Sequence, residues 1–233
     1  MSAYSKTESG SVRRMFAHIA EHYDLLNRLM TLGLDRSWRK STVQGLGLRG
    51  SERVADIGCG SGDLAFEVLK QAPRCRVIAS DFTLEMIEVA KKREGAENIE
   101  WLVADAEALP FKADCCEACV SGFLMRNVPH LEQALSEQRR LLQSGGRIAA
   151  LDTSPPARNL LKPFIDIYFR WIIPALGRLI AGDQAAYTYL PQSTQAFLKA
   201  EELAARFVSA GFSKVRFEKR MLGSVAIHWG RKE

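Results

Sequence analysis

The chain has 233 residues, of which 47% are hydrophobic and 25% are charged, and its formal net charge is +5. These values are ordinary for a globular protein, and they exclude a low-complexity or repetitive chain. The length suits one α/β domain with additions and is short for two domains. The mild positive charge is usual for a solvated surface, and it leaves open a face that binds nucleic acid or an anionic membrane.

The five cysteines do not form the pattern of a metal site. They stand at positions 59, 75, 115, 116 and 119. The close group at 115–119 lacks the second pair of cysteines or histidines that a zinc site needs, so we expect packed thiols and no metal. The amino terminus is polar and lacks the apolar core of a signal peptide. We therefore expect a reduced, cytoplasmic protein.

The first part of the chain predicts a helical extension over residues 1–48. Residues 1–11 are polar and are expected to lack structure. From Val12 onward, apolar residues recur every three or four positions, which is typical of amphipathic helices. A basic patch with one aromatic residue follows, made of Arg36, Trp38, Arg39 and Lys40.

Short apolar strands then alternate with helices over residues 49–233. The expected strands are Arg53–Ile57, Arg76–Asp81, Ile99–Asp105, Ala118–Phe123, Arg147–Asp152, Lys214–Lys219 and Val225–Gly230. The expected helices are residues 63–71, Leu84–Arg93, Leu131–Leu142 (stopped by Gly145 and Gly146) and Ala200–Ala210. This order predicts an α/β fold with a doubly wound, mainly parallel seven-stranded sheet and an antiparallel carboxyl-terminal hairpin.

The alternation stops after the fifth strand, where residues 155–198 read as a helical insertion. Leu160 to Gly182 is strongly apolar, but charged residues and Pro174 interrupt it, so we do not expect a membrane-spanning helix. An apolar helix must bury its surface somewhere. Two interpretations stay open: it packs on the core, or it forms a lid that contacts an apolar substrate or a bilayer surface.

One stretch, Val54 to Asp63, predicts a ligand site. It reads as a buried strand, a turn with glycines at 58, 60 and 62, and the start of a helix. Glycines allow a tight turn and close approach of a ligand, and the helix directs free N–H groups at it. A dinucleotide-binding turn has a third glycine where this chain has Asp63, and an acid there would repel a pyrophosphate. The pattern favours a cationic nucleoside such as S-adenosylmethionine.

Three acids end successive strands of the expected sheet. Asp56 precedes the glycine turn, and Asp81 is placed to hold ribose hydroxyls, as it also would in an NAD site. Asp105 and Ala106 end the third strand, where an adenine would lie. Each acid alone could equally cap a helix or stabilise a turn. Together with the turn, the three predict a nucleoside site.

Further motifs flank this site at both ends of the chain. They are Val12-Arg13-Arg14-Met15-Phe16, Tyr23-Asp24, Asn27-Arg28, Trp38-Arg39, Cys59-Gly60-Ser61-Gly62-Asp63, Asp81-Phe82-Thr83, Asp105-Ala106-Glu107, Arg126-Asn127-Val128, Tyr187-Thr188-Tyr189-Leu190-Pro191 and Ala226-Ile227-His228. With them the chain resembles the menaquinone/ubiquinone C-methyltransferase family, within the class I S-adenosylmethionine-dependent methyltransferases. The resemblance extends from Val12 to Gly230.

The resemblance implies C-methylation of a prenylated quinol, with demethylmenaquinol as the first candidate. The cofactor-binding residues would be Asp56, Gly58, Gly60, Ser61, Gly62, Asp81, Phe82, Asp105 and Ala106. Carbon is a poor nucleophile, so one phenol of the acceptor must be ionised. Arg126 would stabilise that phenolate and Asn127 would orient it. Tyr23, Tyr189 and His228 would contact the acceptor. The basic patch at 36–40 is one small cluster and not a groove, so we expect no nucleic-acid partner. A membrane-surface contact and a homodimer stay open.

The chain also departs from the family pattern. Ser61 stands in place of threonine, and Gly122-Phe123-Leu124-Met125 replaces a Ser-Phe-Gly-Leu run at the end of the fourth strand. The second change removes an expected serine contact beside the acceptor. C-, O- or N-methylation of another small aromatic acceptor is therefore the runner-up activity. Three functions of other classes compete with it. The missing third glycine and Asp63 count against an NAD-dependent oxidoreductase, and the absence of base-methylation motifs near the fourth strand counts against a nucleic-acid methyltransferase. A nonenzymatic binding module would tolerate the loss of Arg126.

Overall fold

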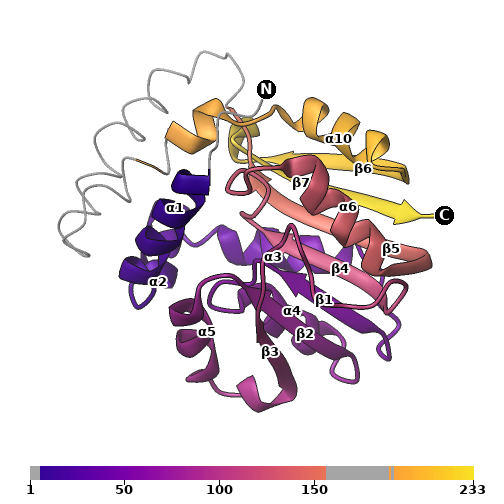
Figure 1. Cartoon of the computed structure of the whole chain (residues 1–233), viewed down its shortest axis with the longest axis horizontal. Helices are drawn as coiled ribbons and strands as arrows, with labels where there is room; N and C mark the ends of the chain where they lie inside the picture. Colours follow the sequence, from indigo (N-terminus) through magenta and orange to yellow (C-terminus); the bar gives the residue numbers. More distant parts are fainter. Residues whose placement is uncertain (1–5, 156–188, 190–191) are drawn as a thin grey trace.

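The computed structural model describes residues 6–155, 189 and 192–233 of the chain (Figure 1). The helices are α1 (Lys6–Ile19), α2 (Tyr23–Met30), α3 (Asp35–Gln44), α4 (Asp63–Gln71), α5 (Leu84–Lys91), η1 (Ala96–Asn98), α6 (Leu131–Leu141), α10 (Ala200–Ser209) and η3 (Met221–Gly223). The strands are β1 (Arg53–Ile57), β2 (Arg76–Asp81), β3 (Ile99–Val103), β4 (Cys116–Gly122), β5 (Leu142–Thr153), β6 (Phe212–Arg220) and β7 (Val225–Lys232).

The strands form one seven-stranded sheet in the order β3-β2-β1-β4-β5-β7-β6. The first five run parallel, and β7 pairs antiparallel with both β5 and β6. This confirms the predicted sheet and its terminal hairpin. The parallel strands all end at one edge, here called the carboxyl edge: Ile57, Asp81, Val103, Gly122 and Thr153. Val225 of β7 pairs with Thr153, so the turn between β6 and β7 lies at this edge too.

Helices cover both faces of the sheet because neighbouring strand residues point to opposite faces. Val54 of β1 packs in a core with Trp38 of α3 and Leu64 of α4. Ala55, the next residue, packs in a second core on the other face, which α6 and α10 cover. In a class of folds with such a sheet, ligands bind at the carboxyl edge. The fold therefore directs attention to the loops at that edge.

The amino-terminal helices contribute a third, smaller core. Val12, Phe16 and Ile19 of α1 pack against Met86 of α5. We call residues 6–34, with α1, α2 and the following turn, the cap. The expectation that residues 1–11 lack structure was wrong from Lys6 onward, since α1 begins there. Extending a helix that packing has already nucleated costs little, even with polar residues.

Two further expectations were also wrong in detail. Gly145 and Gly146 do not stop α6, which ends at Leu141; they lie inside β5, which pairs with β4 and β7. The supposed basic patch is split, because Trp38 and Arg39 are buried against the sheet while Arg36 and Lys40 remain exposed. A helix that packs on a sheet buries one side and exposes the other.

The predicted helical insertion over 155–198 lies mostly outside the described residues; residues 155, 189 and 192–198 are described. They include Tyr189, the predicted substrate contact within the insertion. Within the described parts of the chain, no helix is long and apolar enough to cross a membrane.

Candidate functional site

The turn between β1 and α4 lies at the carboxyl edge and depends on its glycines. Gly58 and Gly62 have φ angles of +66° and +86°, a region that costs other residues conformational energy. A Cβ at Gly58 would lie 2.6 Å from Cδ1 of Leu124, and one at Gly62 would lie 2.6 Å from Cη2 of Trp101. At both positions a side chain would clash with a neighbour, so the turn requires glycine there.

Asp56 supports this turn from below. Its side chain is fully buried, and its Oδ2 accepts a hydrogen bond from the backbone N–H of Ala65 at 2.9 Å, in the first turn of α4. Burial raises the pKa of Asp56 to about 7. Asp56 lies beneath the loop and does not line the cleft, so its predicted role in cofactor binding is indirect. It holds the start of α4 in place.

We expect Asp56→Asn to change the pH dependence of stability. The folded pKa of about 7 lies above the ordinary value of 3.8, so the native protein keeps a proton that the unfolded chain releases, and stability falls as pH rises from 4 to 7. Asparagine keeps the acceptor for Ala65 and removes this titration. We compare the unfolding free energy of the variant minus that of the wild type at two pH values. This difference should be larger at pH 8 than at pH 4 by at least about 1 kcal/mol. Parallel urea titrations across this range measure it, and superimposable pH profiles would contradict it.

Asp81 ties the first loop to the second. Its Oδ2 accepts a hydrogen bond from the N–H of Gly60 at 2.8 Å, and its Oδ1 accepts one from Thr83 at 2.9 Å. Burial raises its pKa, against the effect of these two hydrogen bonds. The carboxylate is fixed at the end of β2 and faces the space above the turn, where the sequence predicts ribose hydroxyls.

Two adjoining cavities form a cleft at the carboxyl edge, enclosing about 410 and 800 Å³ of empty space that is partly open to solvent. They share four lining residues: Gly58, Phe82, Leu124 and Asn127. The first also has Phe16, Tyr23, Gly60, Asp81, Met86, Gly122 and Phe123, and the second Ala104, Asp105, Ala106, Glu107, Val128, Pro129 and His130. The structure thus brings six of the nine predicted cofactor residues into one cleft: Gly58, Gly60, Asp81, Phe82, Asp105 and Ala106.

The chemistry of the cleft fits a cationic nucleoside. Among the described residues, three carboxylates line it and no lysine or arginine does. Such a lining would repel the pyrophosphate of a dinucleotide and suits a sulfonium and an ammonium group. The glycines leave room for close approach at the centre, where the two cavities meet.

Two predicted substrate contacts, Tyr23 and Tyr189, lie close to the predicted catalytic residue Asn127 at the first cavity. The hydroxyl of Tyr189 donates to Oδ1 of Asn127 at 2.9 Å, and Nδ2 of Asn127 donates to the carbonyl of Phe123 at 2.7 Å. Tyr23 lines the same cavity and packs edge-on against Phe16. Burial raises the pKa of Tyr23, partly offset by the charge of Arg126. Tyr23, Asn127 and Tyr189 therefore form a polar group on an otherwise apolar wall.

Arg126 lies behind this group and is buried. Its Nη1 donates to Oδ1 of Asp152 at 2.6 Å, with 4% of the arginine side chain exposed. Its Cζ lies 5.1 Å from the centre of the Phe123 ring. Its Nε is buried and has no hydrogen-bond partner among the described residues. Arg126 is thus not among the lining residues of the cleft, although it follows the lining residue Leu124 closely in the chain and keeps one donor uncommitted.

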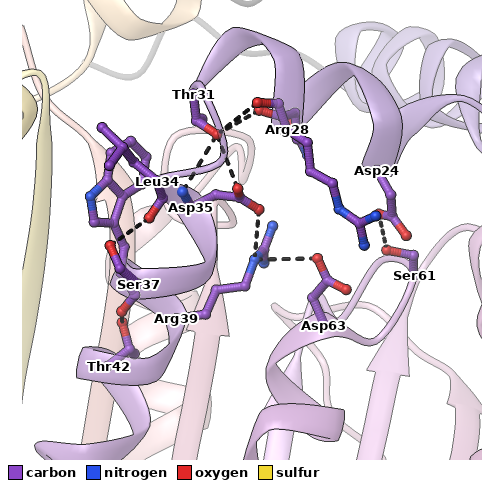
Figure 2. A network of polar contacts seen from close by, with 12 residues as sticks. Asp24, Arg28, Thr31, Leu34, Asp35, Ser37, Arg39, Thr42, Ser61 and Asp63 are labelled. Carbon is purple, nitrogen blue, oxygen red and sulfur yellow. Dashed lines mark hydrogen bonds and ion pairs between the residues drawn. The ribbon is translucent and has the colours of Figure 1, made fainter.

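An ion-pair network fastens the cap to the glycine turn (Figure 2). The hydroxyl of Ser61 donates to Oδ1 of Asp24 at 2.5 Å. Asp63 lies between Arg39, at 3.3 Å, and Arg93, at 2.7 Å. Arg93 also donates to the carbonyl of Ser61 at 2.7 Å and lies 3.7 Å from Asp24. The network joins α2, α3, the segment just after α5 and the turn, so it ties the cap to the cleft.

The network changes the interpretation of Asp63. Burial alone would raise its pKa, but the charges of Arg39 and Arg93 outweigh burial and hold the pKa below its usual range. Asp63 is therefore neutralised by two arginines, and it does not repel a ligand as its place in the sequence suggests. The preference for a cationic ligand therefore comes from Asp81, Asp105 and Glu107, which line the cleft, and not from Asp63.

His228 is not brought to the cleft, against expectation. It is buried in β7 between the rings of Phe207 and Phe217, and its Nε2 lies 2.8 Å from the carbonyl of Ala200. Burial lowers its pKa, so the ring is held neutral in the core beneath α10. A strand alternates its side chains between faces, and His228 points to the face covered by α10.

A larger cavity, of about 900 Å³, lies at the opposite edge of the sheet. Among its lining residues are Arg49, Glu52 and Arg147, and a Glu52–Arg147 ion pair of 2.9 Å spans part of it. It contains none of the predicted site residues. Size alone therefore does not identify the ligand site in this fold, and the position at the carboxyl edge decides.

Comparison with known proteins shows what the chain is similar to. Residues 4–232 match the model of the ubiE/COQ5 methyltransferase family. The chain is 47% identical to a ubiquinone/menaquinone biosynthesis C-methyltransferase UbiE of Desulfotalea psychrophila, with 95% of this chain and 90% of the relative aligned. It is 40% identical to a demethylmenaquinone methyltransferase of Thermus thermophilus, with 93% and 99% aligned. The fold is also that of a SAM-dependent methyltransferase of Thermotoga maritima, with a TM-score of 0.65 at 18% identity, covering 94% of this chain and 100% of that one.

Proposed function

Because the chain belongs to the ubiE/COQ5 methyltransferase family, we propose that it transfers a methyl group from S-adenosyl-L-methionine to a ring carbon of a prenylated quinol. The first candidate reaction converts demethylmenaquinol to menaquinol, as the names of its relatives indicate. The observation that carries the proposal is the cleft at the carboxyl edge. Its glycines and its carboxylates, Asp81, Asp105 and Glu107, make one half acidic, and the other half lies under the cap, with Phe16 and Tyr23, and is also lined by Phe123 and Asn127.

The methyl donor fits the acidic half. Asp81 is fixed where it can accept hydrogen bonds from ribose hydroxyls, and Asp105 and Ala106 flank the place for the adenine. Bound there, S-adenosylmethionine supplies a methyl group already activated by a positive sulfur. The task of the chain is then to hold the acceptor carbon about 3–3.5 Å from that methyl and to exclude water.

The acceptor fits the half under the cap. Its quinol ring would lie between the apolar wall, with Phe16 and Phe123, and the polar group of Tyr23, Asn127 and Tyr189. Asn127 is held at both ends of its amide and so offers a fixed orientation to an acceptor hydroxyl. Arg126 would stabilise the developing phenolate through its positive charge and its uncommitted Nε, reached directly or through one water.

Finer parts of the proposal concern the surroundings of the site. We propose that residues 1–48 act as an extension of a methyltransferase domain over 49–233, and that the 155–198 insertion serves as a substrate lid. A prenyl tail is apolar and resides in membranes, which supports a peripheral contact with a membrane surface. We also propose that two copies of the chain form a homodimer.

Ser61 offers a specific test of the connection between cap and cofactor. Ser61→Ala removes the hydroxyl that donates to Asp24, and the looser cap should weaken binding of S-adenosylmethionine about fivefold, or about 1 kcal/mol. Ser61→Thr keeps the hydroxyl and should retain wild-type affinity. Calorimetric titration of both variants measures this, and equal affinities for the alanine and threonine variants would contradict it.

The activity itself is tested by the quinones of cells that lack this chain. We expect such cells to accumulate the quinone without its ring methyl group, and to regain the methylated form when the gene is restored. Mass spectrometry of extracted quinones makes the comparison. An unchanged quinone pool, or accumulation of a different aromatic compound, would refute the quinol assignment and favour another acceptor.

A further inference from the structure

Exposed apolar side chains are distributed unevenly over the surface. Among the described residues, eight large hydrophobic side chains are exposed. Seven of them lie in the cap, at its junction with α3, or at the carboxyl edge: Leu25, Leu29, Leu32, Leu34, Leu84, Val103 and Leu222. The eighth, Val208, lies near the end of α10, just before β6 begins at the opposite edge. Scattered exposed leucines need no explanation, but a set gathered at one end of the molecule does.

The positions follow from the topology. Val103 ends β3, Leu84 begins the helix that follows β2, and Leu222 lies in the turn between β6 and β7. All three elements meet the carboxyl edge, as does α2 through the contact of Asp24 with Ser61. The exposed apolar end of the molecule is therefore the end at which the cleft opens.

Leu32, in the turn between α2 and α3, is the most exposed of these residues. Its side chain is 75% exposed, and its φ angle is +52°. The left-handed region is unfavourable for leucine, and an exposed leucine gains no packing in return. Glycine or asparagine would fit this position better in an isolated protein. A contact with a further apolar surface would account for a leucine that is both strained and exposed.

The charges around the leucines are strongly biased. Between residues 12 and 40 the exposed cationic side chains are Arg13, Arg14, Arg28, Arg36 and Lys40. Among its described side chains, the same stretch has one exposed acid, Glu21. A surface that combines exposed leucines with arginines and lysines is typical of proteins that bind anionic headgroups and insert apolar side chains between them.

We propose that this end of the molecule, led by Leu25, Leu32 and Leu34, docks on an anionic lipid bilayer with the cleft facing the membrane. The proposal rests on the proposed function, because a prenylated acceptor could then enter the cleft without crossing water. Docking uses side chains of residues that the structure describes. The leucine side chains insert shallowly between lipid headgroups that pair with the arginine and lysine side chains, and docking needs no membrane-spanning segment.

Flotation with vesicles tests this inference on the full-length protein. We expect binding to vesicles of phosphatidylcholine with phosphatidylglycerol, weaker binding to phosphatidylcholine alone, and loss of binding as salt increases. Leu32→Asn should lower the vesicle partition coefficient about tenfold, the factor expected when one leucine no longer inserts. Because asparagine tolerates the left-handed region, the same variant should melt at an equal or higher temperature.

The matched control is Val208→Asn, which removes an exposed apolar side chain at the opposite edge and should leave vesicle binding unchanged. Equal binding by wild type and Leu32→Asn, or an equal loss in both variants, would overturn the inference. So would a shift from dimer to monomer in Leu32→Asn, which would assign the leucines to an interface with a second copy.

A methylation assay distinguishes failure of the docking surface from failure of the proposed function. Leu32→Asn should methylate a soluble short-chain quinol normally and a vesicle-bound long-chain quinol slowly. Vesicle binding without methylation of either quinol by the wild type would refute the proposed function and leave the docking surface standing.

Discussion

Gly58→Val is expected to weaken binding of S-adenosylmethionine by at least about a hundredfold, or about 2.8 kcal/mol, while the protein stays folded. Gly58 lies where the two cavities of the cleft meet and has a φ of +66°. A Cβ there would lie 2.6 Å from Cδ1 of Leu124, so the added side chain must displace Leu124 and the turn. Both movements close the space that the donor needs. Isothermal titration with S-adenosylmethionine, with circular dichroism as a check on the fold, measures the effect.

Gly95→Val provides a matched control for this prediction. Gly95 also has a positive φ, +82°, but a Cβ there would have nothing within 4 Å. The control therefore carries the same kind of backbone strain without a steric clash, at a distance from the cleft. We expect it to lower stability and to leave donor affinity unchanged. Similar losses of affinity in both variants would mean that strain, and not occupation of the cleft, explains the effect.

Arg126→Met is expected to have two separable effects. It leaves Asp152 buried without its 2.6 Å partner, and breaking a buried ion pair in this way should lower the free energy of unfolding by about 3–5 kcal/mol. It also removes the charge that would stabilise the phenolate, so turnover should fall at least about a hundredfold. Chemical denaturation and a methyl-transfer assay measure the two effects independently.

The double variant with Asp152→Asn distinguishes the structural role from the chemical role. It removes both buried charges and keeps one side-chain oxygen, enough for the 2.7 Å hydrogen bond from the backbone N–H of Thr153, and gives up the longer 3.3 Å bond from that of Arg126. We expect most of the lost stability to return, donor affinity to match the wild type, and turnover to stay low. A double variant with normal turnover would show that Arg126 only holds the fold together.

The sheet could be predicted because its signals are local. Apolar runs such as Val54–Ile57 alternate with helices of the right length, and the glycine turn identifies the carboxyl edge. The ends of elements were less predictable where distant strands decide them. Gly145 and Gly146 read as a helix stop, yet they lie within β5, in an irregular stretch between Leu142 and Arg147, the residues at which β5 pairs with β4.

The site was predictable in its residues and less so in their roles. Sequence reasoning identified Asp81, Asn127 and Tyr189, which the fold brings to one cleft. It could not foresee that Arg126 would be buried against Asp152, 26 positions away in the chain. It also placed His228 at the acceptor, because the motif could not reveal which face of β7 the ring would occupy.

The network around Asp63 shows the same limit. Arg39 and Arg93 were not recognised as site residues, since ion pairs over such sequence separations leave no local pattern. One signal was present: Asp24, Arg39 and Asp63 all belong to motifs that carry the family resemblance. Motif residues that are charged and lie on different elements are good candidates for a shared network.

The most direct test of methyl transfer to carbon follows the methyl group itself. The purified chain is incubated with S-adenosylmethionine carrying an isotopically labelled methyl group and with a reduced, prenylated naphthoquinone that lacks its ring methyl. Nuclear magnetic resonance of the product then locates the label. We expect the label on a ring carbon of the quinol. A label on a phenolic oxygen, or an unlabelled quinol beside intact donor, would contradict C-methylation by this chain.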